Sequence, residues 1–195
     1  MAKFTPDEFA KHLNEAIKAT LNALPEIIDT QANDAKALIK ERIKQKGYGV
    51  NESGQEIAFK PYSKNKLPLY FFENSGTKTS QKKLKQKKIK GEPNPYKDGI
   101  SYEEWRVLNG KQVDHRDLIF TGEMFRRLDI VNRNKSEKGY TVTVGGIDES
   151  TDNKLEWNSK SNGIGNVLRL SKQEEKTLAE VTEQEIIETF KKFLG

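Results

Sequence analysis

The feature that most constrains the fold is a run of apolar residues at helical spacing that fills the first 46 positions. Thr5, Pro6 and Glu8 predict its start, because a hydroxyl cap, a first-turn proline and a glutamate three residues after the cap form a capping box. Gly47 predicts its end. Pro25 either bends one long helix or divides it into a helical hairpin, and both remain open. The apolar positions repeat every three to four residues: Phe9, Leu13, Ala16, Ile17, Leu21, Leu24, Ile28, Ala32, Ala35, Ile39 and Ile43.

Beyond Gly47 the pattern predicts short strands. Residues 57–62 and 67–72 are apolar runs bounded by prolines and turn residues, which is typical of short extended segments. Residues 140–144 alternate cleanly and end in two glycines, so they are the clearest strand of the chain. Residues 154–159 are expected to be a weaker strand that partners it.

Three further helices are expected. Tyr102, Trp105 and Leu108 have short helical spacing, and residues 123–128 follow a hydroxyl cap at Thr121. Ser171 with Glu174 forms a second capping box, and residues 182–194 carry the closing helix. Its apolar face is expected to contain Ile186, Ile187, Phe190 and Phe193 or Leu194.

This order of elements predicts an α+β fold in which an antiparallel β-sheet is packed by a long N-terminal helix and a C-terminal helix. The strands are spaced as in hairpins, which leaves no room for crossover helices. A chain of 195 residues with 34% hydrophobic content can form one ordinary core. We therefore expect residues 1–195 to be a single domain with a long, lysine-rich loop insertion at about 64–111.

The most biased segment is residues 78–90, which contains seven lysines and is expected to be an exposed loop. Its lysines could neutralise DNA phosphates or contact a partner protein: Lys82, Lys83, Lys85, Lys87 and Lys88. A solvated loop is the simpler interpretation, because interleaved aromatic residues and groove-reading arginines are missing.

Composition excludes several classes of site. The chain has no cysteine, so disulfide scaffolds, thiolate metal sites and cysteine nucleophiles are ruled out. The first residues lack the apolar core of a signal peptide and no later run approaches membrane-spanning length, so we expect no membrane association and a location in the cytoplasm. The net charge of +5 is a small excess over many ions and decides little.

Only one cluster resembles a catalytic or metal-binding site, namely Asp114, His115, Arg116 and Asp117. Alternate residues of an extended segment point to opposite sides, so Asp114 and His115 would not converge on one ion without a tight turn. A metal-dependent nuclease built on Asp114, His115 and Asp117 is an alternative, but we expect a structural role. No catalytic, cofactor or metal residue is assigned, and the chain is not expected to be an enzyme.

Four segments in order, residues 43–47, 59–63, 117–128 and 167–175, resemble the phage virion-morphogenesis and tail-completion family. The residues that carry the resemblance form a Pro-Tyr-Ser element and a Thr-Gly-x-Met element: Pro61, Tyr62, Ser63, Thr121, Gly122 and Met124.

The resemblance implies a structural virion protein of a tailed bacteriophage, made in the host cytoplasm. Such a protein forms a homo-oligomeric ring of six or twelve copies at the head–tail neck or connector, or at the tail terminus. Its partners would be portal, adaptor or tail proteins, with non-specific contact to packaged DNA, and no catalytic residue or cofactor comes with the family. The alternative is a small basic DNA-binding protein that acts through the lysine-rich segment.

Overall fold

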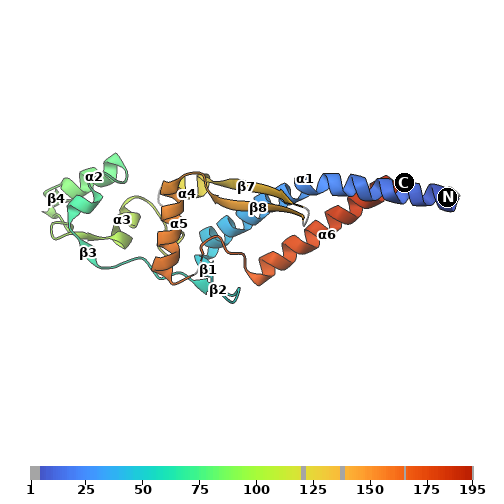
Figure 1. Cartoon of the computed structure of the whole chain (residues 1–195). Helices are drawn as coiled ribbons and strands as arrows, with labels where there is room; N and C mark the ends of the chain where they lie inside the picture. Colours follow the sequence, from blue (N-terminus) through green and yellow to red (C-terminus); the bar gives the residue numbers. More distant parts are fainter. Residues whose placement is uncertain (1–4, 120–121, 137–138, 165, 195) are drawn as a thin grey trace.

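The computed structural model describes residues 5–119, 122–136, 139–164 and 166–194. The molecule is elongated (Figure 1). The long helix α1 (Pro6–Lys46) and the last helix α6 (Lys172–Leu194) run antiparallel, and both chain ends lie at one end of the molecule. The insertion, residues 64–111, lies at the opposite end. With 41 residues, α1 is about 60 Å long at its usual rise per residue.

Helix α1 begins and ends where local hydrogen bonds predict. The Thr5 hydroxyl accepts from the Glu8 amide at 3.3 Å, and the Thr5 amide donates to the Glu8 carboxylate at 2.8 Å. Gly47 adopts φ +66° and donates its N–H to the Ile43 carbonyl, which closes the last turn. Pro25 lies inside the continuous helix, so the helical-hairpin alternative is wrong.

The α+β class with antiparallel strands and long terminal helices is confirmed. Within the described residues, however, the strands pair as separate two-stranded ladders rather than one sheet. Strand β1 (Tyr48–Val50) pairs with β2 (Glu56–Ala58). Strand β7 (Leu128–Ser136) pairs with β8 (Gly139–Gly146), and this hairpin lies along α1.

The prediction of a strand at residues 154–159 is wrong, because they belong to helix α5 (Glu149–Asn162). The Asp148 side chain caps this helix by accepting from the Thr151 amide at 2.8 Å, and Gly163 ends it at φ +71°. Its buried residues recur at helical spacing: Thr151, Leu155, Ser159 and Asn162. The partner of β8 is instead β7, whose second half is polar and exposed.

The main core, which defines the body of the molecule, lies where the C-terminal half of α1 meets α5 and the short helix α4 (Glu123–Arg126). Its buried members are Ile39, Ile43, Phe59, Met124, Phe125, Leu128, Leu155, Ile164 and Val167. A buried ion pair between Arg42 of α1 and Glu174 ties the first turn of α6 to this body. Glu174 also forms the expected capping box with Ser171, so the closing helix starts at Lys172, ten residues before the predicted position.

The insertion is folded, so the prediction of a lysine-rich loop is wrong. Its elements are β3 (Lys66–Leu67), η1 (Leu69–Phe72), α2 (Lys78–Lys85), β4 (Lys88–Ile89), β5 (Glu92–Pro93), β6 (Ile100–Ser101) and α3 (Tyr102–Leu108). Pro68 ends the strand expected at 67–72 after Leu67, and a 3-10 turn follows. Four buried residues form a second small core: Phe72, Leu84, Ile100 and Trp105.

Candidate functional site

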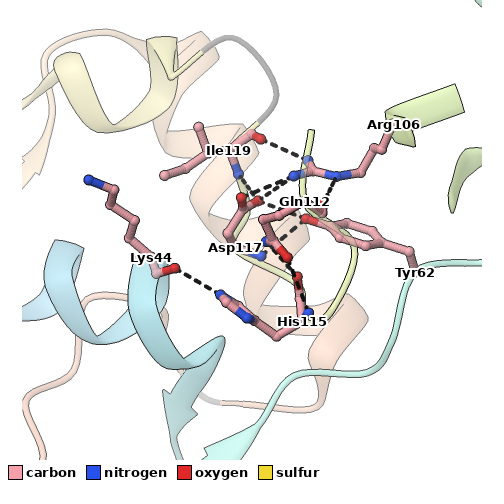
Figure 2. Close-up of polar contacts among 7 residues, drawn as sticks. All are labelled: Lys44, Tyr62, Arg106, Gln112, His115, Asp117 and Ile119. Carbon is pink, nitrogen blue, oxygen red and sulfur yellow. Dashed lines mark hydrogen bonds and ion pairs between the residues drawn. The ribbon is translucent and has the colours of Figure 1, made fainter. Parts of the chain in front are cut away.

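A buried polar cluster of Tyr62, Arg106 and Asp117 joins the insertion to the body (Figure 2). Tyr62 lies on the chain just before the insertion, Arg106 on α3 within it, and Asp117 on the loop that follows it. Tyr62 donates its hydroxyl proton to Asp117 Oδ1 at 2.7 Å, and Arg106 Nη2 donates to both Asp117 oxygens at 3.0 Å. The cluster therefore closes the two ends of the insertion onto one carboxylate.

Asp117 is held as a carboxylate by its neighbours. Burial on its own would raise the pKa of Asp117, but hydrogen bonds from Gln112, the Ile119 amide and Tyr62, together with the charge of Arg106, bring that pKa below its usual value. The Ile119 amide donates to Oδ1 at 2.8 Å. Both oxygens of the carboxylate thus accept hydrogen bonds from within the chain.

The guanidinium group of Arg106 finds acceptors for nearly all of its hydrogen-bond donors among the residues around it. Besides Asp117, its Nε donates to the Gln112 carbonyl at 3.0 Å and its Nη1 to the Ile119 carbonyl at 2.7 Å. Its guanidinium also lies 4.3 Å from the centre of the Tyr62 ring, a cation–π contact. Because Arg106 is only 1% exposed, losing it would leave the buried Asp117 carboxylate without its cation and two carbonyls without the donor they have now.

Tyr62 contributes both a polar hydroxyl and an apolar ring to the same cluster. Burial and the hydrogen bond to Asp117 raise the pKa of Tyr62, so the phenol stays protonated and remains a donor. Its oxygen in turn accepts from the Asp117 amide at 3.1 Å. The ring packs against Tyr102 at a centroid distance of 5.6 Å.

The four residues of the 114–117 cluster lie in different environments. His115 Nε2 is 2.8 Å from the Lys44 carbonyl near the end of α1 (Figure 2), and because a carbonyl only accepts, this nitrogen carries the proton. Arg116 donates to the Asn162 side chain at 3.2 Å and to the Pro61 carbonyl at 3.0 Å. Asp114 is exposed, and Asp117 is enclosed by Arg106. The arrangement ties α1, α5 and the insertion together and does not converge on one point.

No group of three or more metal-ligating side chains occurs among residues 5–119, 122–136, 139–164 and 166–194. Nor does a helix in that part of the chain combine the length and the apolar character needed to cross a membrane.

Beside the cluster lies a pocket of about 510 Å³ between the insertion and α5. Its walls include Leu67 and Tyr102 of the insertion, and Trp157 and Ser161 of α5. The helices and strands of the insertion make few direct contacts with those of the body. The polar cluster, rather than apolar packing across this seam, therefore fixes how the insertion is oriented.

The residues that carry the family resemblance separate into two groups. Tyr62 is in the polar cluster, and the exposed Pro61 and Ser63 on either side offer their carbonyls, Pro61 to Arg116 and Ser63 to the Glu103 amide at 3.2 Å. Two others lie in or beside the main core, since Gly122 caps α4 at φ +73° and Met124 is buried. Thr121 lies outside the described residues.

The candidate lysines lie on ordered elements. Lys82, Lys83 and Lys85 project from α2, while Lys87 and Lys88 lie in and just before β4, and all five are exposed. Sequence reasoning missed Arg106, the residue with the most buried polar contacts of the site. Arg106 lies four residues after Tyr102 and therefore on the inner face of α3, which is the signal that could have identified it.

No protein-family model, curated protein or solved structure matches this chain.

Proposed function

We propose that this chain is a structural protein of a tailed bacteriophage particle, and that it assembles as a ring at the head–tail junction or the tail terminus. The observation that carries the proposal is an apolar side on the helical arm, defined as α6 together with residues 6–31 of α1. Motif order supports the class of particle, as set out above, and the arm supplies a surface for contact between copies.

On α1, the buried residues Ala16, Thr20, Ile27 and Gln31 mark the face that packs against α6. Gln31 donates to Glu185 of α6 at 3.2 Å, which confirms this orientation. Ile17 and Leu21 each follow a buried residue by one position, so their side chains turn about 100° away from that face. They are 43% and 57% exposed.

Helix α6 repeats this arrangement. Ile186 is half-buried, and Ile187, one position later, is 41% exposed. Because the two helices are antiparallel, an equal turn about each helix axis brings the side chains to the same side of the pair. Leu21 and Ile187 therefore belong to one apolar side of the arm.

The opposite side of the arm is more polar. A shallow hollow there is lined by Glu26, Thr30, Glu185, Glu188, Thr189 and Lys192, together with Ala23 and Ile27. A layer of two helices can bury only the facing stripe of each helix, so an apolar side requires a further layer. Phe9 and Phe193, 51% and 47% exposed, add aromatic area near the same end of the molecule.

We assign that further layer to a second copy of this chain. The apolar side includes residues from both the first and the last helix of one copy, and in a ring it packs against a different surface of the next copy, because ring contacts are heterologous. Exposed apolar side chains gathered on one side of an element are typical of protein contact surfaces. A ring built in this way needs no chemical step, because its role is to match the shapes of the proteins above and below it.

The test is the assembly state of the purified chain, measured by native mass spectrometry and electron microscopy. We expect closed rings of six or twelve copies, and we expect the Leu21→Gln/Ile187→Gln variant to be monomeric with an unchanged helical circular dichroism spectrum. Burial of each side chain contributes about 1.5–3 kcal/mol, so the pair should weaken each contact by roughly 10²–10⁴-fold. The matched control is Tyr70→Gln/Val107→Gln, which removes two exposed apolar side chains from the insertion instead.

Rings that persist in the Leu21→Gln/Ile187→Gln variant would show that the arm is not the contact surface. A wild-type chain that stays monomeric at all concentrations would contradict the ring itself. Mass spectrometry of mature particles produced from the same genome tests the virion role directly, since the proposal requires the chain to be present there in several copies.

A further inference from the structure

The positive charge of the chain is concentrated in the insertion. Residues 64–111 contain twelve lysines and arginines against five acidic residues, a net charge of +7, whereas the whole chain has a net charge of +5. The remainder of the molecule is therefore slightly acidic, at −2. The net charge of the chain arises entirely at the end of the molecule opposite the arm (Figure 1).

The lysines are held on a rigid support. In α2, Ser80 and Leu84 are buried, and the side-chain amide of Asn94 donates to the Leu84 carbonyl at 2.7 Å. Thr77 caps the helix and accepts from the Ser80 amide at 3.1 Å. With these residues turned inward, the lysines of α2 and β4 face solvent.

These lysines form one positive surface, defined as Lys78, Lys82, Lys83, Lys85, Lys87, Lys88 and Lys90. Lys78, Lys82 and Lys85 are spaced so that they share one face of α2. No ion pair found within the described ranges, 5–119, 122–136, 139–164 and 166–194, involves a lysine of this surface.

Helix stability explains only part of this charge. Lysines in the last turn interact favourably with the helix dipole, which accounts for Lys82, Lys83 and Lys85. Lys78 stands in the first turn, where positive charge is unfavourable, and no acidic residue accompanies it there. It also repels Lys82 one turn later. Lys87, Lys88 and Lys90 lie beyond the helix, so the dipole does not account for them either.

We propose that this positive surface binds the phosphate backbone of duplex DNA without reading its sequence. Lysine is depleted in protein–protein interfaces, and such interfaces depend on buried aromatic or aliphatic anchors. The only large apolar residue of α2, Leu84, is 3% exposed and belongs to the core of the insertion. Phosphate contacts need only positive charges, whereas recognition of guanine relies mainly on arginine. The sole arginine of the insertion, Arg106, is buried and engaged with Asp117.

The test is equilibrium binding of the full-length chain to two short fluorescent DNA duplexes of unrelated sequence, followed by anisotropy between about 50 and 200 mM salt. We expect equal affinity for both duplexes and a steep loss of affinity with salt. For each copy bound to the duplex, the Lys82→Gln/Lys83→Gln/Lys85→Gln variant should lower the slope of log affinity against log salt by about 2.7, at 0.9 per phosphate contact. Glutamine has a helix propensity close to that of lysine, so α2 should be retained.

The matched control is Lys44→Gln/Lys60→Gln/Lys135→Gln, which removes three exposed lysines outside the insertion. It should keep the wild-type slope. A second variant, Lys87→Gln/Lys88→Gln, tests the part of the surface outside α2 and should lower the slope by about 1.8.

Three outcomes would overturn the proposal. The first is no binding at about 50 mM salt, and the second is an equal loss of affinity in the control variant. The third is displacement of DNA by polyglutamate at lower charge concentration than by unlabelled DNA, which would identify an acidic protein as the partner. The phosphate contacts of one copy do not require a ring, so DNA binding can fail while the proposed function holds, and a ring can fail to form while DNA binding holds.

Discussion

Replacing Arg106 by methionine should weaken the fold far more than its position in a short, charged helix suggests. Methionine fills a similar length without a charge, so the change isolates the polar contacts of the cluster. The substitution leaves the buried Asp117 carboxylate without its cation and the carbonyls of Gln112 and Ile119 without donors. Removing one partner of a buried ion pair typically costs about 3–5 kcal/mol.

For a chain of this size, each kcal/mol lowers the melting temperature by roughly 2–4 °C, so Arg106→Met should lower it by roughly 6–20 °C. Urea unfolding measures the free energy directly. The matched control is Arg133→Met, which breaks an ion pair with Asp29 in which the arginine side chain is half exposed. Exposed pairs contribute about 0–1 kcal/mol, so this control should change stability little.

Hydrogen exchange should locate the effect. Arg106 joins the insertion to the loop around Asp117, so amide exchange should accelerate in residues 64–119 while the arm keeps its protection. The Arg106→Met/Asp117→Leu double variant should be less destabilised than the sum of the two single variants, because it leaves no unpaired buried charge. A loss below about 1 kcal/mol for Arg106→Met, equal to that of Arg133→Met, would refute the assignment of the cluster as the joint.

Three further predictions follow from single positions. The pKa of Asp117 is lower in the folded chain than in the unfolded chain, where it is about 3.9. The stability that the Asp117 carboxylate contributes is therefore complete above about pH 3.9 and is lost as the pH falls through the folded pKa. The difference in unfolding free energy between wild type and Asp117→Asn should therefore shrink in acid. Gly47→Ala should destabilise the chain by clearly more than Gly110→Ala in thermal unfolding, because both glycines have positive φ but only at Gly47 would a Cβ meet His115, at 2.8 Å. Leu84→Ala should cost about 2–5 kcal/mol, detected as faster amide exchange confined to the insertion.

Helix ends were the most predictable part of the fold. Thr5, Gly47 and Ser171 were identified from the sequence because a cap depends on hydrogen bonds within three or four residues. Whether Pro25 interrupts α1 was not predictable, since a helix continues through proline when packing on both sides compensates for the lost hydrogen bond.

Helix α2 was missed because its stability comes from distant residues. Taken alone, residues 78–85 offer one apolar side chain, Leu84, and a capping box in which serine stands where glutamate or glutamine is usual. Its helical conformation depends on packing of Leu84 with Phe72 and Trp105. A pattern search within a short window cannot detect such contacts.

Similar reasoning explains the misplaced strand. Leu155 and Trp157 alternate with polar residues as they would in a strand, but only Leu155 is buried and Trp157 is 66% exposed. The stronger signal was the pair of Asp148 before the segment and Gly163 after it, which cap a helix between them. For the candidate site, the sequence identified Tyr62 and Asp117 on separate grounds, but nothing in their spacing indicated that Arg106 lies between them.

The two proposals assign different contacts to opposite ends of one elongated molecule, and this arrangement has a measurable consequence. The arm and α2 lie at opposite ends of the molecule (Figure 1), so changes at the two ends should be additive in the free energy of unfolding. A variant that combines Leu21→Gln and Ile187→Gln with Lys82→Gln, Lys83→Gln and Lys85→Gln should lose both assembly and DNA binding. Assembly and DNA binding should still be coupled, because a ring places many positive surfaces on one duplex and raises the overall affinity without a new kind of contact. The monomeric arm variant should therefore bind DNA more weakly than the wild-type ring, and its salt slope should be smaller because fewer phosphates are contacted at once.

Equal slopes for ring and monomer would mean that only one copy at a time reaches the DNA, which would place the positive surfaces on the outside of the ring rather than around a central channel.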